Sequence, residues 1–175
     1  MIVYIISGVI AIIIIFTMIM IVKVSKVNDL KDNIKETRKN LSTLLNKKYN
    51  ILNSVRKFLK TNFKVELEKI EKSNLEEEYD MELDKNLNIL NKDFNDIVNN
   101  TPKIQKEKKI DLFKTNLKDI DENIYGLKSY YNDNVQKINK LLEKPLYKLA
   151  ALITKTEKYK KFDIKKEADL EILKD

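Results

Sequence analysis

Few side chains in this sequence could do chemistry, because its 175 residues include no Cys and no His. Thiolate catalysis, disulfides and imidazole ligands or bases are therefore excluded by composition. Among the carboxylates, Glu122 with Tyr125 comes closest to an acid/base pair. Nothing in the sequence supplies a nucleophile or an oxyanion hole for this pair, and two Gly leave little material for glycine-rich phosphate loops. We therefore expect a protein that is not an enzyme and that uses no cofactor.

An acidic cluster in the middle of the chain could suggest a divalent-cation site. It lacks the alternating Asp loop with Gly that a calcium site needs. Ser73, with Glu76 three residues later, forms a capping box, and acids in the first turn of a helix stabilise its positive end. We interpret the cluster as a solvated helix start and expect no metal site. Its members are Glu76, Glu77, Glu78, Asp80, Glu82 and Asp84.

Two asparagines, Asn132 and Asn139, are seven residues apart and share one face of a predicted helix with Val135. A buried Asn needs hydrogen-bond partners, and it can fix the register between packed helices. The pattern favours a polar seam at or near a helical core. A surface groove that recognises a partner is the alternative.

Long helices must position these residues, and the first one begins with an apolar stretch. Residues 1–22 carry no charged side chain, and as a helix they would span roughly 33 Å, close to the hydrocarbon thickness of a bilayer. A cleaved signal peptide would need a basic start and small residues at a cleavage site, and this stretch has neither. We predict an uncleaved transmembrane anchor over residues 1–22.

Basic residues follow the anchor directly, at Lys23, Lys26, Lys31 and Lys35. By the positive-inside rule they place the following domain in the cytoplasm of a cell with a single-pass inner-membrane anchor. Those near anionic head groups would gain about 1 kcal/mol each. The formal net charge of +7 also raises nucleic-acid binding, but the lysines are interleaved with acids and no stripe of aromatic and basic residues is present. We predict contact with the lipid bilayer and no nucleic-acid partner.

Beyond the anchor, apolar residues recur in steps of three and four, which is typical of amphipathic helices. Pro102 and Pro145 mark helix boundaries. The fold class predicted is all-α: an N-terminal transmembrane helix followed by an elongated antiparallel three- to four-helix bundle over residues 23–159. The polar tail, residues 160–175, is expected to fray. The predicted helices cover residues 23–72, 74–100, 104–144 and 145–155.

The third predicted helix carries a motif that resembles a known family. Tyr131, Asn132, Val135 and Asn139 match the Tyr-Asn-x-x-Val-x-x-x-Asn signature of the LemA family. Upstream, the resemblance includes the turn, the Phe/Leu repeat and the Glu-x-Ile of that family; downstream, it includes a Pro-to-Ala segment and an aromatic pair. These further matches are Thr101-Pro102, Phe113, Leu117, Glu122, Ile124, Pro145, Ala150, Tyr159 and Phe162, together with residues 45–50 near the start.

The chain departs from the family pattern at three places. It has no Trp on the first helix, Asn53 stands where a Pro often occurs, and Lys144 replaces an aromatic residue before the later proline. The resemblance implies a membrane-anchored antiparallel helical bundle with no established enzymatic activity.

These observations predict a non-enzymatic scaffold or protein-interaction module at the bacterial cell membrane. It would associate with itself or with other membrane proteins, and no small-molecule substrate is evident from the sequence. The alternative is a membrane-associated sensor or regulator, in which the helices leaving the bilayer rearrange on a signal.

Overall fold

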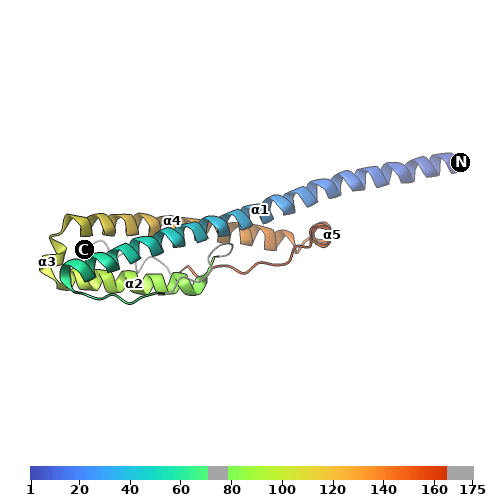
Figure 1. Cartoon of the computed structure of the whole chain (residues 1–175). Helices are drawn as coiled ribbons and strands as arrows, with labels where there is room; N and C mark the ends of the chain where they lie inside the picture. The colour runs from blue at the N-terminus through green and yellow to red at the C-terminus, as the bar shows by residue number, and fades with distance from the viewer. Residues whose placement is uncertain (71–78, 165–175) are drawn as a thin grey trace. The chain divides into compact units, whose positions relative to one another are not determined.

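The computed structural model describes residues 1–70 and 79–164 (Figure 1). Within these ranges the regular structure is entirely helical, which confirms the predicted all-helical class for this part of the chain. The helices are α1 (Ile2–Phe63), α2 (Met81–Asn100), α3 (Pro102–Gln105), α4 (Lys108–Leu141) and α5 (Pro145–Thr154).

The first helix, α1, is uninterrupted over 62 residues and changes environment along its length. Residues 1–19 are all exposed, and the most apolar 18-residue window has a mean hydropathy of 3.1 with 6% of it buried. This part is long and apolar enough to cross a membrane. Further along, apolar side chains at helical spacing enter the core; they are Val27, Leu30, Ile34, Leu41, Leu45, Leu52, Val55 and Leu59.

The end of α1 differs from the prediction of a helix that reaches residue 72. The helix stops at Phe63, where Lys64 takes a left-handed conformation (φ 56°) and the N–H of Val65 donates to the carbonyl of Leu59 at 3.4 Å. Residues 64–70 then return alongside α1 as non-helical chain.

The misplaced helix end has a simple cause in the sequence. Phe63, Leu67 and Ile70 fit helical spacing, but Val65 and Leu67 fit the alternation of extended chain equally well. Leu67 is buried in the returning segment, so burial of an apolar side chain does not distinguish the two conformations.

The second helix begins at Met81 rather than at residue 74. Asp80 is its N-cap, since its carboxylate accepts hydrogen bonds from the N–H groups of Glu82 (2.9 Å) and Leu83 (3.1 Å). The predicted capping box of Ser73 and Glu76, with the neighbouring acids Glu77 and Glu78, lies outside the described residues.

The remaining helix bounds follow the prolines. Helix α2 ends at Asn100 as predicted, and Pro102 opens the four-residue α3. The third predicted helix, 104–144, is therefore divided, and its long part, α4, ends at Leu141. Helix α5 begins at Pro145 as predicted.

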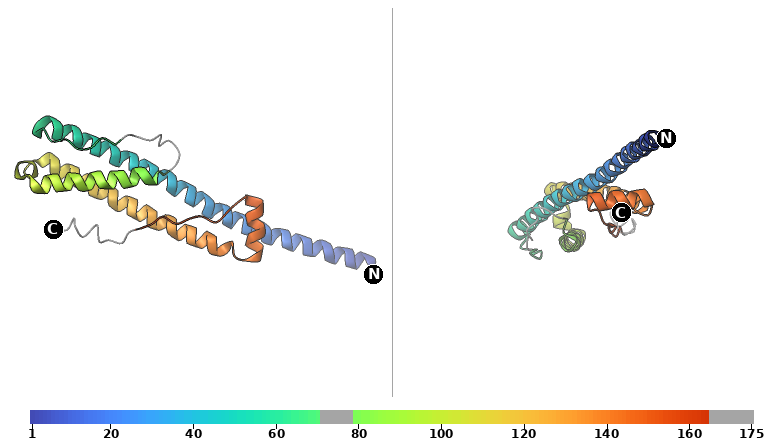
Figure 2. Two further views of the ribbon diagram at one scale, coloured as in Figure 1. Left: turned by 90° about the horizontal axis from the view of Figure 1, so that it is seen from below. Right: turned by 90° about the vertical axis from the view of Figure 1, so that its right-hand side faces the viewer.

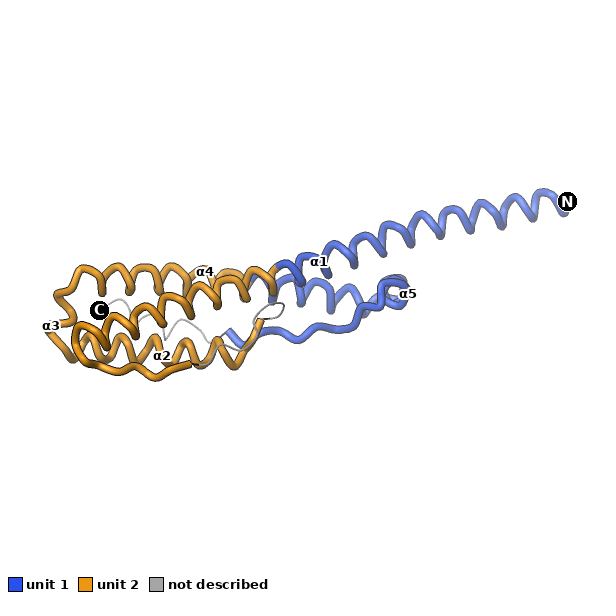
Figure 3. The backbone as a smooth tube through the Cα atoms, viewed as in Figure 1, with its two compact units in different colours: residues 1–36, 130–175 blue, residues 37–129 orange. Residues whose placement is uncertain are grey.

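The chain divides into two compact units (Figure 3). Among the described residues, unit 1 contains 1–36 and 130–164, and unit 2 contains 37–70 and 79–129. Both α1 and α4 contribute to each unit.

In unit 2, α1 and α2 run in the same direction, and α4 runs opposite to both (Figure 1). The expectation of a fully antiparallel arrangement is wrong for α1 and α2. The physical reason is the returning segment, because residues 64–70 run back along α1 without helical structure before α2 starts.

Candidate functional site

The motif asparagines bind a backbone segment rather than another helix. In unit 1, residues 155–164 lie along α4 without helical structure. The amide of Asn132 donates to the carbonyl of Phe162 (2.9 Å) and accepts from its N–H (2.8 Å). The amide of Asn139 does the same with Tyr159, at 2.8 Å and 3.0 Å. We call residues 155–164 the strap.

The spacing of the two asparagines matches the spacing of their partners. Seven residues of α-helix rise about 10.5 Å. Three residues of extended chain, from Tyr159 to Phe162, cover about 10 Å. Two Asn side chains seven apart can therefore each pair with both backbone groups of one residue in an extended segment.

This geometry corrects two sequence-based expectations. The seam of Asn132 and Asn139 does not set the register between helices, and the tail is not frayed between residues 160 and 164. The alternative is a groove in which these asparagines recognise a partner protein. In the structure the chain's own strap already pairs with both amide groups. The sequence reveals the polar face of α4 but not the segment that covers it.

The other motif residues complete the same surface. The Tyr131 ring is fully buried, lies 4.2 Å from the Phe162 ring between centroids, and its hydroxyl donates to the carbonyl of Lys160 at 3.2 Å. Val135 and Ala150 are fully buried in the unit 1 core. The motif residues Tyr131, Asn132, Val135 and Asn139 thus pack in the unit 1 core or pair with the backbone of the strap.

Not all predicted site residues come together. Glu122 and Ile124 belong to unit 2, where Glu122 is exposed and Ile124 is buried. Pro145 is exposed as the first residue of α5.

The basic residues after the apolar stretch fall into two pairs. Lys26 and Lys35 are exposed. Lys23 places its Nζ 5.0 Å from the centre of the Tyr147 ring, and Lys31 donates to the carbonyl of Thr154 at 3.0 Å. The second pair therefore joins α1 to α5 within unit 1.

Unit 2 contains a buried ionic network that was not predicted. Lys48 on α1 is fully buried, and its Nζ donates to Asn88 on α2 and to the carboxylate of Asp121 on α4. The amide of Asn91 donates to the other oxygen of Asp121 at 3.0 Å. Three helices are thus linked through one ammonium group.

A second ion pair lies beside the first. Asp84 is buried, pairs with Lys128 and accepts a hydrogen bond from the Tyr79 hydroxyl at 2.6 Å. Burial raises the pKa of Tyr79 well above its usual range, and the Asp84 carboxylate raises it further. The amide of Asn88 donates to Asp84 at 3.4 Å and connects the two pairs. Asp84, expected in a solvated cluster, is instead part of the core.

A signal for this network was present in the sequence. The apolar stripe of α1 skips from Leu45 to Leu52, and Lys48 occupies the missing helical position. Asp121 likewise stands on the face of Leu117 and Ile124. A charge at a core position of one helix and an opposite charge at a core position of another indicate a buried pair.

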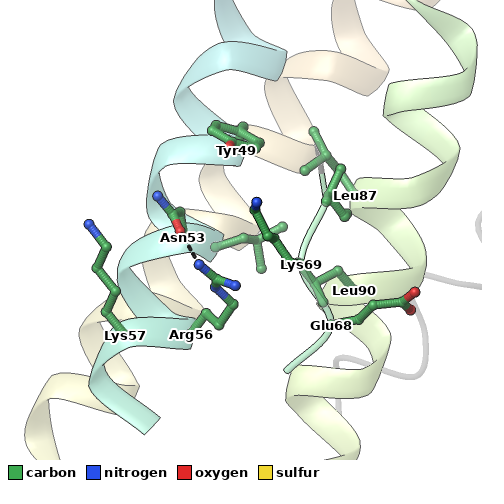
Figure 4. Close-up of a pocket in the computed structure, with 10 residues that line it drawn as sticks. Tyr49, Asn53, Arg56, Lys57, Glu68, Lys69, Leu87 and Leu90 are labelled. Atoms are coloured by element: carbon green, nitrogen blue, oxygen red, sulfur yellow. Dashed lines mark hydrogen bonds between the residues drawn. The ribbon is translucent and has the colours of Figure 1, made fainter. Parts of the chain in front are cut away.

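Unit 2 also has a pocket between α1, α2 and the returning segment (Figure 4). Arg56, Lys57 and Lys69 supply its positive charge, and Arg56 donates to the side-chain amide oxygen of Asn53 at 3.4 Å. The Glu68 carboxylate lies on the other side of the returning segment from Arg56 (Figure 4). The lining residues are Tyr49, Leu52, Asn53, Arg56, Lys57, Glu68, Lys69, Ile70, Leu87 and Leu90.

The described residues contain no group of three or more Asp, Glu, Cys or His side chains placed to hold a metal ion. The polar groups with the best geometry are used within the chain, in backbone pairing by Asn132 and Asn139 and in ion pairs around Lys48 and Asp84. The paired asparagines hold the strap against α4, and the ion pairs link α1, α2 and α4.

In the described residues the protein is helical, with a long apolar helix segment at the start of α1 and paired asparagines on α4. The family model of the LemA family matches residues 22–172, and the chain belongs to that family. No curated protein and no solved structure matches the chain.

Proposed function

We propose that this protein is a non-enzymatic scaffold of the bacterial cell membrane, held there by the start of α1. The observation that carries the proposal is the change along this one helix, from the exposed and predominantly apolar residues 2–19 to the buried stripe that begins at Val27. Apolar surface exposed to water costs about 25 cal/mol per Å². A bilayer removes this cost over the length of the stretch.

The rest of the chain would stand at the cytoplasmic face as a bundle of helices that presents surfaces to itself or to other membrane proteins. Support for the side of the membrane comes from Lys23, Lys26, Lys31 and Lys35 after the apolar stretch. Support for a non-enzymatic role comes from the absence of His and Cys in the sequence and from the use of buried charges in structural ion pairs.

The anchor is tested by placing charges in it. Lysine at the centre of a spanning helix costs about 2.5–3.5 kcal/mol of insertion free energy per residue. We expect a double variant, Ile13→Lys with Ile14→Lys, to leave the membrane fraction on alkaline extraction, while the wild type stays. Ile89→Lys is the matched control, because Ile89 is an exposed isoleucine in unit 2. Retention of the double variant would overturn the anchor.

The side of the membrane and the scaffold role need separate measurements. Ser25→Cys introduces a unique thiol at an exposed position, and we expect it to react with an impermeant reagent only after the cells are opened. A photo-crosslinking residue at the exposed Leu112 should yield adducts with a second copy or with another membrane protein. A chain that stays monomeric and gives no adduct in membranes contradicts the scaffold role.

The continuity of α1 also favours the second candidate, a sensor or regulator. A helix without a break from Ile2 to Phe63 could carry a displacement at the membrane into unit 2. Spin labels on exposed positions of α1 and α2, such as Lys47 and Lys85, would report this as a distance change when a ligand or an ion is added. A constant distance across all conditions would leave the scaffold as the better description.

A further inference from the structure

Helix α5 is apolar on two opposite faces. One face joins the core of unit 1 through Ala150, which is fully buried, and through the partly buried Tyr147 and Ala151. Lys148 is the single charged residue of the helix. The opposite face, which we call the outer face of α5, consists of Leu146, Leu149, Leu152 and Ile153, with exposed fractions of 37%, 45%, 76% and 64%.

The same helix packs against α1 where the apolar stretch ends. Met20 and Val24 of α1 belong to the side chains that pack on the unit 1 core together with Tyr147. The contact of Lys23 with the Tyr147 ring and the hydrogen bond from Lys31 to Thr154 lie in the next turns. Figure 2 shows α5 lying across α1 rather than along it.

These positions have a geometric consequence, which rests on the proposed membrane anchor. If residues 1–22 cross a bilayer, Met20 and Lys23 lie at the membrane surface, and a helix packed across α1 at that level lies in the plane of the surface. Its outer face then meets the boundary between head groups and acyl chains.

We propose that the outer face of α5 is embedded in this boundary, so that the protein contacts the bilayer at two places far apart in the sequence. Continuity with the apolar start of α1 identifies lipid as the occupant of the outer face. Lys144, Lys148 and Lys155, on and beside α5, are exposed and suit anionic head groups. Exposed apolar side chains rimmed by cations are typical of helices that lie in a membrane surface.

The second contact gives α5 a mechanical role. A spanning helix alone can tilt and shift along its axis. Because α5 is fixed to α1 by the unit 1 core, its insertion sets the depth of α1 and orients unit 1 on the membrane.

The experiment uses the full chain reconstituted in vesicles of phosphatidylcholine and phosphatidylglycerol. A solvent-sensitive fluorophore is attached to single cysteines in the otherwise Cys-free sequence, at Leu152→Cys on the outer face and at Leu112→Cys as the matched exposed leucine of unit 2. Ile13→Cys, in the apolar stretch, reports the anchor itself. Quenching is measured with nitroxide-labelled lipids.

We expect lipid quenching and blue-shifted emission at Leu152→Cys and at Ile13→Cys, and neither at Leu112→Cys. Quenching at Ile13→Cys without quenching at Leu152→Cys overturns the inference and leaves the anchor intact. Blue-shifted emission at Leu152→Cys that lipid does not quench means that protein covers the outer face, and it also overturns the inference. Absence of quenching at Ile13→Cys would remove the anchor on which both proposals depend.

Discussion

The two units cover the same pair of long helices with different third elements. In unit 2 the third element is α2, which satisfies its own backbone hydrogen bonds. In unit 1 it is the strap, a non-helical segment whose backbone groups at Tyr159 and Phe162 pair with side chains of α4. The side chains of α1 and α4 that contact the third element therefore differ between the two units.

Unit 1 supplies neutral amides to a backbone, through Asn132 and Asn139. In unit 2 the helices are linked by oppositely charged side chains, Lys48 and Asp121, and by the amide of Asn91 that bonds Asp121. The comparison teaches that the paired asparagines are required by extended chain, because one Asn amide can satisfy the donor and the acceptor of a single residue. Between helices the backbone groups are already bonded within each helix, so ion pairs between side chains suffice to link them.

The largest expected effect is in unit 2. Asp121→Ala leaves the fully buried Lys48 ammonium without its counter-charge, and such a loss costs about 3–5 kcal/mol of unfolding free energy. We expect this from urea unfolding of the full chain in detergent micelles, followed by circular dichroism. The double variant Lys48→Met with Asp121→Leu should recover much of the stability, because it removes both charges.

Asp119→Ala is the control for this prediction, since Asp119 is an exposed acid of the same helix. Its effect should stay within about 0.5 kcal/mol. Equal effects of the two substitutions would mean that the buried network does not distinguish unit 2 from unit 1.

The next effect is in unit 1. Asn139→Ala removes the amide that pairs with the N–H and carbonyl of Tyr159, at a cost of about 1–3 kcal/mol. Hydrogen exchange should accelerate at the Tyr159 amide while the amides of α2 keep their protection. Asn139→Asp should act alike, because a carboxylate cannot donate to the Tyr159 carbonyl. Lys140→Ala, at an exposed neighbour, is the control, and unchanged exchange in Asn139→Ala would show that the strap is held by other contacts.

Sequence reasoning succeeded where local pattern decides structure. Apolar steps of three and four identify α2 and α4, and Pro102 and Pro145 place the boundaries beside them. The motif around Tyr131 predicts the LemA family, and the match of the family model over residues 22–172 confirms it.

It failed where conformation depends on distant residues. The spacing of Asn132 and Asn139 is visible in the sequence, but their partner is a segment 20 to 30 residues away whose own pattern is polar. Residues 64–70 carry apolar residues that suit a helix as well as a returning segment. The buried Lys48 was hidden because a lysine in a predicted helix is ordinarily read as surface.

A smaller expected effect is a pH dependence of the unfolding free energy that comes from Tyr79 in unit 2. The pKa of Tyr79 is raised by burial and by Asp84, whereas an unfolded tyrosine ionises near pH 10. Above about pH 10 the unfolded state therefore loses a proton that the folded state keeps, so stability falls with rising pH, by at most about 1.4 kcal/mol per pH unit. At neutral pH, Tyr79→Phe should cost about 0.5–1.5 kcal/mol through the lost hydrogen bond to Asp84.

The measurement for Tyr79 is the stability difference between the wild type and Tyr79→Phe across the alkaline range. The difference should shrink above about pH 10, because phenylalanine has no proton to lose. A difference that stays constant with pH would show that the Tyr79 hydroxyl ionises equally in both states.

The smallest effect returns to the strap of unit 1, where Lys158 pairs with Glu143 at 3.3 Å and both side chains are more than 60% exposed. Lys158→Ala should cost about 0–1 kcal/mol, and salt should reduce even this, because water and ions screen an exposed pair. Urea unfolding at low and high salt measures it beside Asn139→Ala. If Lys158→Ala were the more damaging of the two, surface charge rather than amide pairing would hold the strap, and the contrast between the units would be lost.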